Sequence, residues 1–448
     1  MDQTSSVRNL NILLKEDREK GGKLEETYVP DAFKIRVKMH KLRKLLQNSL
    51  HRMRIGKMTE AVYTKRKSRI DTVLEKRKIE HDSLVEGALQ LVSKAIGKKD
   101  FRVSVALLPT TVGGKKVYGI GKDLAQILVV RLIQRVLKIV YKVSMPPRDM
   151  LIGQIKALAL DGMPKYIIRA DVEQFYESVA HDHLLDAIHQ SPELSIVVKR
   201  ILTRLIKDYV AASGDEKGLP RGIGISAYLS EIYLAGIDRK IKSQEGVFYY
   251  ARYVDDIVLM YAPQRNELAD HYLSKLKSIF SEKGLLLNSK TRELNVLTEQ
   301  KGKFEYLGYE FDLSPGKRGI RLSTKKEKKY KARIEKSFSD YQKKHTFIVA
   351  KAADELFVRC LFLTGNMRLF NRKSNAFIGI YFSNRFITDT AQLNGLDSFF
   401  QHKISTLLDV SLKRKLGKLS FAAGFRDKIF RNFDLEKLSE ISQGWNHA

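Results

Sequence analysis

The spacing of apolar residues divides the chain into three parts. Between Lys34 and Lys78, apolar side chains recur every three or four positions among many Lys and Arg, which predicts helices with one apolar and one cationic face. Residues 100–313 alternate short apolar runs with helical periods, a pattern typical of an α+β region. From Ser323 onward the pattern is again basic and helical. We therefore expect an α+β centre flanked by two helical regions.

Short apolar runs bounded by turn residues predict the strands of the central region. These runs are residues 165–170, 247–252, 257–261, 285–287 and 304–311. Helical periodicity predicts helices over residues 124–141, 182–210, 222–242 and 268–280, the last one ended by Gly284 as a C-cap. The most apolar of these helices is interrupted by Arg131, Arg135 and Lys138 at helical spacing, so it is expected to be amphipathic and not a membrane span.

Charge is the unusual feature of the composition. The chain has 81 Lys and Arg against 51 Asp and Glu, a net charge of +30. Such an excess attracts polyanions, either nucleic acid or an acidic membrane surface, and composition alone does not separate the two. Solubility requires far less charge, so a merely solvated surface is the weaker interpretation. For the basic helices of residues 34–78, nucleic-acid contact and a surface helix pair are equally good interpretations.

Two further features bound the class of protein. Cys360 is the only cysteine, which excludes an intramolecular disulfide and a structural zinc site built from cysteines. It lies in an apolar run, where a buried small side chain is expected. The N-terminus has no basic-then-apolar signal pattern, so a cytoplasmic protein without a membrane partner is expected.

The strongest local motif is Tyr253-Val254-Asp255-Asp256, placed between two apolar strand candidates. Two adjacent acids inside a sheet would carry a large desolvation penalty, so a sharp turn at the sheet edge is expected to expose them. A divalent cation would offset their charge there, and oxygen-only ligands suit Mg²⁺. The alternative is an ordinary Asp-Asp turn without a metal.

Two weaker features precede this motif. Asp171 ends a strand candidate 84 residues before Asp255 and is a candidate for completing a two-metal site, although an acid at a strand end is a surface or capping residue in most proteins. Between the acids, residues 218–226 form a glycine-containing segment at a helix entrance, where the backbone can approach a ligand closely.

At these residues the chain resembles a known family. Asp171–Tyr176, Leu219–Ser226 and Tyr253–Asp256 resemble palm motifs A, B and C of reverse transcriptases, in the same order. Residues 285–291 are similar to motif D, and residues 304–309 are similar to the primer-grip hairpin. The resemblance covers roughly residues 100–315. It implies an α+β right-hand polymerase with a helical N-terminal extension (1–100), fingers and a ferredoxin-like palm covered by helices on one face (101–315), and a helical thumb and C-terminal region (316–448).

The resemblance also implies roles for single residues. Asp171 and Asp255 correspond to direct ligands of two Mg²⁺ ions (Mn²⁺ being the alternative), Asp256 to a supporting acid, and Val172 to a neighbouring metal contact. Tyr176 corresponds to the aromatic gate that excludes a ribose 2′-hydroxyl, unless it is simply a core aromatic. Further nucleotide contacts are implied at Phe175, Pro220, Gly222, Ser226, Lys290 and Arg148, and the primer grip is implied at Tyr306, Leu307 and Gly308.

The motif B segment and the two extensions look most like the bacterial defence-associated and abortive-infection reverse transcriptases. This implies RNA-directed DNA synthesis from dNTPs in antiphage defence, on an RNA template or a dedicated noncoding RNA, with a DNA product. A second reverse transcriptase subunit or a homo-oligomer is a further expectation. Two alternatives stay open: a template-independent or protein-primed polymerase of the same fold, and a catalytically silent RNA-binding scaffold.

Overall fold

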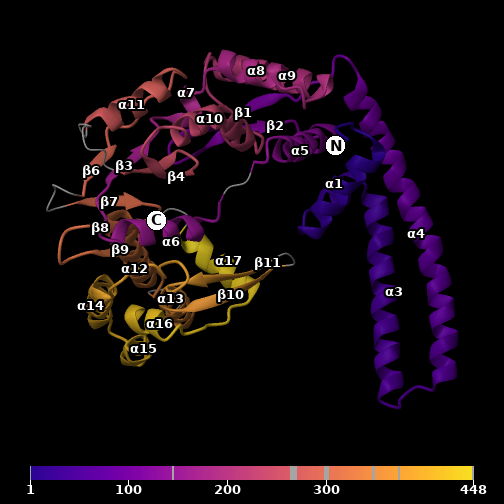
Figure 1. Ribbon diagram of the computed structural model, residues 1–448. Helices are drawn as coiled ribbons and strands as arrows, with labels where there is room; N and C mark the ends of the chain where they lie inside the picture. The colour runs from indigo at the N-terminus through magenta and orange to yellow at the C-terminus, as the bar shows by residue number, and fades with distance from the viewer. Residues whose placement is uncertain are drawn as a thin grey trace. The chain divides into compact units, whose positions relative to one another are not determined.

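The computed structural model describes residues 2–143, 146–262, 270–296, 302–345, 349–371 and 374–445. The chain forms two compact units, each drawn from separated segments (Figure 1). The first unit combines Met1–Ser144 with Gln174–Ile237, and the second combines Met145–Glu173 with Asp238–Ala448. These units interleave the three linear ranges expected from the sequence, and that linear division stays a prediction.

The first unit is mainly helical. Its N-terminal part contains α1 (Val7–Glu19), α2 (Leu24–Tyr28), α3 (Pro30–Arg54) and α4 (Glu60–Gly97), followed by the hairpin of β1 (Val105–Val112) and β2 (Lys115–Ile120) and by α5 (Leu124–Val140). Its second part contains α7 (Phe175–Ser178), α8 (His181–Gln190), α9 (Ile196–Ser213) and most of α10 (Ser226–Lys242). The amphipathic helix expected at 124–141 is confirmed as α5. None of the helices in the described ranges has the length and apolar content needed to cross a membrane.

Two helix predictions in this unit were wrong in their extent. The single helix expected over 182–210 is two helices, because the segment between α8 and α9 contains Pro192 and Ser195, whose hydroxyl accepts a hydrogen bond from Val198 N and starts a new helix. The helix expected from Gly222 begins only at Ser226. Gly222 has a φ of 99°, which is outside the helical region.

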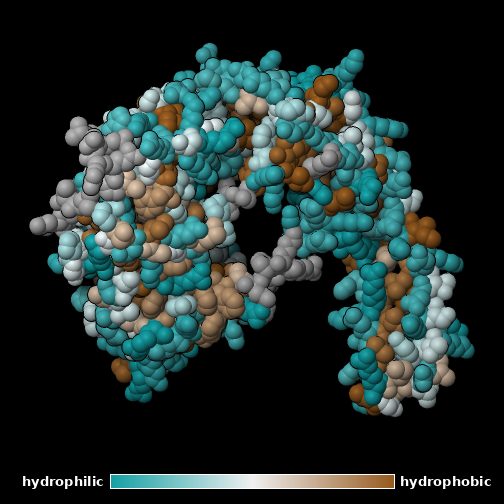
Figure 2. Space-filling model, viewed as in Figure 1, coloured by the Kyte–Doolittle hydropathy of each residue, from teal (hydrophilic) through white to brown (hydrophobic). Residues whose placement is uncertain are grey.

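The basic helices α3 and α4 form a long antiparallel hairpin (Figure 1). Hydrophilic residues cover most of it, and a hydrophobic stripe runs along its length (Figure 2). Ion pairs tie its base to the rest of the unit. The carboxylate of Glu25 is almost fully buried and accepts hydrogen bonds from Arg36 at 2.8 Å and Arg18 at 3.4 Å, and it lies 3.2 Å from Nε2 of the α4 residue His81. The hairpin is therefore fixed at its base by polar contacts and along its length by an apolar seam.

The second unit contains a four-stranded antiparallel sheet. Its strands are β3 (Tyr166–Asp171), β4 (Val247–Tyr253), β5 (Asp256–Tyr261) and β6 (Arg292–Asn295), in the order β4-β5-β3-β6. With the strands numbered along the chain, this is the 4-1-3-2 order of a ferredoxin-like sheet, as predicted. The strand expected at 285–287 is wrong: Leu287 makes one isolated bridge to Val172, since Leu285 N is used to close the preceding helix on Phe280 O.

Both faces of this sheet are covered within the second unit. On one face, Tyr272 of α11 (Asp270–Ser281) stacks on Tyr261 at a ring distance of 4.2 Å. Gly284, with a φ of 68°, ends the helical turn as predicted, while residue 268 lies outside the described residues. On the other face, α6 (Arg148–Leu160) shares a hydrophobic core with Ile167, Val258 and Met260. The sheet is thus a buried platform that supports whatever its strand ends carry.

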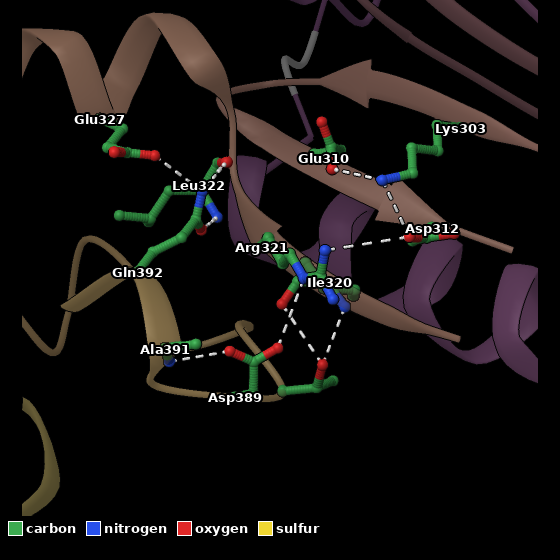
Figure 3. Close-up of polar contacts among 11 residues, drawn as sticks. Lys303, Glu310, Asp312, Ile320, Arg321, Leu322, Glu327, Asp389, Ala391 and Gln392 are labelled. Atoms are coloured by element: carbon green, nitrogen blue, oxygen red, sulfur yellow. Dashed lines mark hydrogen bonds and ion pairs between the residues drawn. The ribbon is translucent and has the colours of Figure 1, made fainter. Parts of the chain in front are cut away.

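A second sheet contains β7 (Lys303–Tyr306), β8 (Tyr309–Asp312) and β9 (Gly319–Leu322). The single strand expected at 304–311 is instead the β7–β8 hairpin, because Leu307 and Gly308 both have positive φ and form a two-residue turn. The edge strand β9 is covered by residues 388–392: Thr388 and Gln392 exchange hydrogen bonds with its backbone, as Figure 3 shows for Gln392 and Leu322. Its unpaired groups are therefore satisfied by side chains.

The remaining elements are mainly helical, as predicted. They are α12 (Thr324–His345), α13 (Val349–Thr364), α14 (Ala391–Ser405), α15 (Val410–Leu416), α16 (Phe421–Arg426) and α17 (Leu435–Gly444). The sequence analysis missed a strand hairpin, β10 (Asn366–Asn371) with β11 (Ser374–Gly379). Cys360 is buried as expected, and burial raises the pKa of its thiol.

Candidate active site

The candidate acids meet at one end of the four-stranded sheet. Antiparallel pairing of β3 with β5 places Asp171 opposite Asp256, and pairing of β4 with β5 places Tyr253 opposite Asp256. Val254 and Asp255 form the two-residue turn between β4 and β5. Val254 has a φ of 60°, which is rare and strained for a β-branched residue and costs about 1–3 kcal/mol. The predicted sharp turn is therefore present, and it displays the acids at the sheet edge.

Arg252 braces this turn from below. Its guanidinium donates to both carboxylate oxygens of Asp238, at 2.9 and 2.7 Å, and to the carbonyl of Val254 at 2.9 Å. The hydroxyl of Tyr250 donates to the same Asp238 carboxylate at 2.6 Å. Because a bidentate Arg–carboxylate pair has a defined geometry, these contacts hold the turn in its strained form.

The acids are electrostatically unfavourable to one another. Burial, and then the charge of Asp255, raises the pKa of Asp171 above its ordinary value. Burial raises the pKa of Asp256 to about 6 even though Arg169 lies against it, with Nη2 and Oδ1 at 2.6 Å. The structure therefore gives the two sheet acids different surroundings: Asp256 has a cationic partner, while Asp171 faces the Asp255 charge.

The donor chemistry fits a hard divalent cation. Asp171 and Asp255 supply carboxylate oxygens whose mutual repulsion a bound cation would relieve, and Val172 can contribute only its backbone carbonyl because its side chain is apolar and buried. The described ranges contain no group of three or more His, Cys, Asp or Glu side chains arranged around one point. This agrees with Asp256 turning to Arg169, so that two acids and not three face the cation position.

A cavity of about 690 Å³ opens beside these acids and gathers several of the predicted residues. Asp171, Asp256 and Lys290 line it together with Arg148 and the predicted primer-grip residues Tyr306, Leu307 and Gly308. Asp255 is not among its lining residues. The remaining cationic side chains of its wall are Arg169, Arg292, Lys303, Lys325, Lys326 and Lys329. Eight cations and four acids thus line a cavity suited to a polyanion.

Arg148 lies at the β7–β8 turn. Its guanidinium donates to the carbonyl of Leu307 and lies 5.9 Å from the ring centre of Tyr309. Tyr306 is almost fully buried, and burial raises the pKa of its hydroxyl. The hairpin turn is therefore rigidly supported, and Arg148 is positioned by it.

Sequence reasoning missed two cations of this cavity. Arg169 follows three apolar strand residues and points to an acid 87 positions away, a pairing that no local pattern reveals. Lys326 was seen only as one member of a basic run at the start of a helix. Its ammonium lies 4.6 Å from the ring centre of Tyr309, and burial, with Arg148 second, lowers its pKa to about 7. The signal that could have found it was its place directly after the predicted primer grip.

The remaining predicted residues belong to the first unit. Tyr176 is half-buried, and the guanidinium of Arg221 lies 4.8 Å from its ring centre, while Phe175 is buried. A Cβ on Gly222 would come within 2.5 Å of Val117, so only glycine fits there. The buried Ser226 hydroxyl donates to the carbonyl of Pro220 at 2.7 Å. The structure thus places Pro220, Gly222 and Ser226 in one tight loop that also holds Tyr176, since Leu219 N donates to Tyr176 O at 2.7 Å.

Comparison with known proteins agrees with this geometry. Residues 110–311 match the family described as reverse transcriptase (RNA-dependent DNA polymerase). No curated protein matches the sequence.

Three solved structures with similar chains are telomerases. Apo telomerase from Candida tropicalis truncated from the C-terminal domain has 14% identity and a TM-score of 0.34, with 50% of this chain and 55% of that chain covered. Candida albicans telomerase with a TWJ fragment of telomeric RNA has 13% identity and a TM-score of 0.38, with 73% and 66% covered. Apo telomerase from Candida tropicalis has 14% identity and a TM-score of 0.39, with 77% and 61% covered. The chain thus spans from about half to two thirds of the length of these structures.

The family match covers every strand of the four-stranded sheet and both acid-bearing motifs. Together with the mixed helices and strands, it confirms the predicted α+β right-hand polymerase fold. Residues 110–311 therefore form a reverse transcriptase domain of the RNA-dependent DNA polymerase family.

Proposed function

We propose that this chain synthesises DNA on an RNA template with Asp171 and Asp255 as the metal-binding carboxylates. The observation that carries the proposal is the register of β3 and β5, which sets Asp171 beside the strained Val254-Asp255 turn at the mouth of a cationic cavity. A strained turn that displays clustered acids is costly, and such strain is typical of functional sites. A silent scaffold gains nothing from it.

Two Mg²⁺ ions, or Mn²⁺, held by Asp171 and Asp255 with the Val172 carbonyl nearby would activate the attacking hydroxyl and stabilise the leaving pyrophosphate. Asp256 is the supporting acid, and its ion pair with Arg169 orients it. Lys290 is exposed at the cavity wall and is placed to attract a phosphate group. Arg148 and Lys326, beside the Leu307–Gly308 turn, supply positive charge to a nucleic-acid backbone.

In the first unit, Tyr176 selects the deoxyribose sugar in this proposal. The contacts that support this are those of its ring with Arg221 and of its backbone with Leu219, which limit its movement. Phe175, Pro220, Gly222 and Ser226 shape the loop around it. The competing interpretation, that Tyr176 is only a packing residue, is tested below.

The RNA partner in this proposal binds the hairpin of α3 and α4. Residues 38–78 carry fourteen Lys and Arg against three Asp and Glu, a net charge of +11 on fewer than a tenth of the residues. These cations are mostly exposed and lie on both helices. A structured RNA such as a dedicated noncoding RNA presents the matching row of phosphates. We further propose a role in antiphage defence, alone, as a homo-oligomer or with a second reverse transcriptase subunit.

Asp171→Asn and Asp255→Asn test the catalytic assignment. Each variant should lose nucleotide incorporation on a primed RNA template in Mg²⁺ while keeping its RNA affinity. Thermal stability should stay equal or rise, because one of two repelling charges is removed. Asp100→Asn, an exposed acid in the first unit, is the matched control and should behave as the unchanged protein. Incorporation by Asp255→Asn at the unchanged rate would end the assignment.

The biological role needs a separate test. Cells expressing the chain with its native flanking sequence should plate fewer phage, and cells expressing the Asp255/Asp256 double variant should not. Equal protection by the double variant would favour the scaffold alternative. Sequencing of products made on RNA that co-purifies with the protein separates templated from template-independent synthesis.

A further inference from the structure

An exposed group of aromatic rings lies at the β10–β11 hairpin of the second unit, away from the acids in sequence. We call it the aromatic platform: Phe377 on β11, Tyr381 and Phe382 just after it, and Phe430 after α16. Phe377 stacks on Phe382 with ring centres 5.0 Å apart, and Phe430 meets these two rings at 6.0 and 5.9 Å. Phe377 is 43% exposed and Phe430 is 48% exposed. Rings that pack on each other yet keep this much surface in water are ready to bind a further flat group.

The platform is held rigidly by a buried asparagine. The side chain of Asn366 is almost fully buried, donates to the carbonyls of Gly424 and Ile429, and accepts from Tyr381 N at 2.8 Å. Its backbone pairs with the segment that carries Phe430, through Asn366 N to Ile429 O at 2.8 Å and Arg431 N to Asn366 O at 2.7 Å. One residue therefore links the three segments that carry the rings, so the platform is formed before a ligand arrives.

Cations accompany the rings. Arg368 lies directly opposite Phe377 in the β10–β11 register, with its guanidinium carbon 5.7 Å from the ring centre. Lys428, held at a φ of 49°, places its ammonium 4.6 Å from the ring centre of Tyr381. The neighbouring acid Asp427 is already paired with Arg426 at 3.1 Å. The rim of the platform is therefore positively charged.

We infer that the aromatic platform binds single-stranded nucleic acid, by stacking of unpaired bases on Phe377 and Phe430 and by contact of Arg368 and Lys428 with the backbone phosphates. Stacking on an aromatic ring contributes to binding for any base, which makes it a sequence-tolerant contact. The bases of a duplex already stack on each other and present no free faces along its length. A protein partner would instead favour a contact centre depleted of charge, whereas here cations lie against the rings.

The test measures binding by the full chain without nucleotides, so that its result does not depend on the proposed polymerase activity. The probes are an RNA and a DNA single strand of about 12 nucleotides, within the range that one binding fold covers, each with a fluorescent base analogue, and a duplex of equal length. The double variant Phe377→Ala/Phe430→Ala should weaken binding of the single strands about tenfold or more and reduce quenching of the analogue. Binding of the duplex should change little. RNA and DNA strands compared in parallel identify which of them the platform prefers.

Three controls keep the test sharp. Phe248→Ala removes a phenylalanine of equal exposure (46%) from β4 and should leave single-strand binding unchanged. Phe377→Trp/Phe430→Trp keeps stacking and should retain affinity, whereas Phe377→Leu/Phe430→Leu keeps apolar surface without stacking and should lose it. Unchanged affinity in the alanine variant, full affinity in the leucine variant, or equal loss for the duplex would each overturn the inference. Failure of this test alone leaves the polymerase proposal standing, since that proposal is judged by incorporation in the Asp171 and Asp255 variants.

Discussion

Replacing Arg252 tests whether the strained turn needs its brace. The Arg252→Met variant keeps the apolar stem but loses three hydrogen bonds, two to Asp238 and one to the Val254 carbonyl. The side chain of Arg252 is 8% exposed and that of Asp238 is 19% exposed. Removing one partner of a buried ion pair costs about 3–5 kcal/mol of unfolding free energy. We expect about 3 kcal/mol, because Asp238 keeps the hydrogen bond from Tyr250 and part of its hydration.

The same change should act on the rate of synthesis. Without its brace, the turn can relax from the φ of 60° at Val254, which shifts Asp255. A displacement of about 1 Å at a reacting centre lowers the rate by about 100-fold. Urea unfolding and single-nucleotide incorporation measure the two effects, and Arg239→Met, the exposed arginine next to Asp238, is the matched control.

A double-mutant cycle isolates the pair itself. Asp238→Asn should lose stability on its own, and the double variant should be less destabilised than the sum of the two single variants, since each single change leaves a charge or an amide without its partner. Additive single effects, or wild-type incorporation by Arg252→Met, would refute the assignment of Arg252 as the residue that positions the turn.

Three further predictions concern the first unit. The lowered pKa of Glu25 stabilises the folded state above about pH 4.5 and is lost as pH falls through its folded value, while the raised pKa of His81 contributes fully below about pH 6.5 and is lost as pH rises through its folded value, so stability against pH should plateau between them and Glu25→Gln should remove the plateau. Tyr176→Ala should incorporate ribonucleotides roughly 5- to 150-fold better relative to deoxynucleotides, whereas equal loss of both would make Tyr176 a packing residue. Neutralising the four cations of residues 65–69 should reduce the slope of log affinity for structured RNA against log salt by about 0.9 per lost phosphate contact, and neutralising the four cations of residues 413–418 should not.

Local order was largely determined by the sequence. The strands β3, β4 and β5 follow from short apolar runs, and α5 follows from its helical period, because alternation and periodicity act over a few neighbouring residues. The acidic turn was predictable for the same reason, since two adjacent acids between apolar strands are stable only at a sheet edge. Errors arose where a local pattern had two solutions: residues 182–210 form two helices, and residues 304–311 form a hairpin.

Pairing between distant residues was decided by the tertiary structure alone. Asp171 comes to lie opposite Asp256 only because β3 enters the sheet between β5 and β6, and Arg169 finds Asp256 by the same register. No periodicity encodes such a pairing, since it depends on which strands share an edge. The cationic cavity and the aromatic platform have the same origin. Their side chains come from segments tens of residues apart, and the packing of those segments, rather than any local motif, brings each set onto one surface.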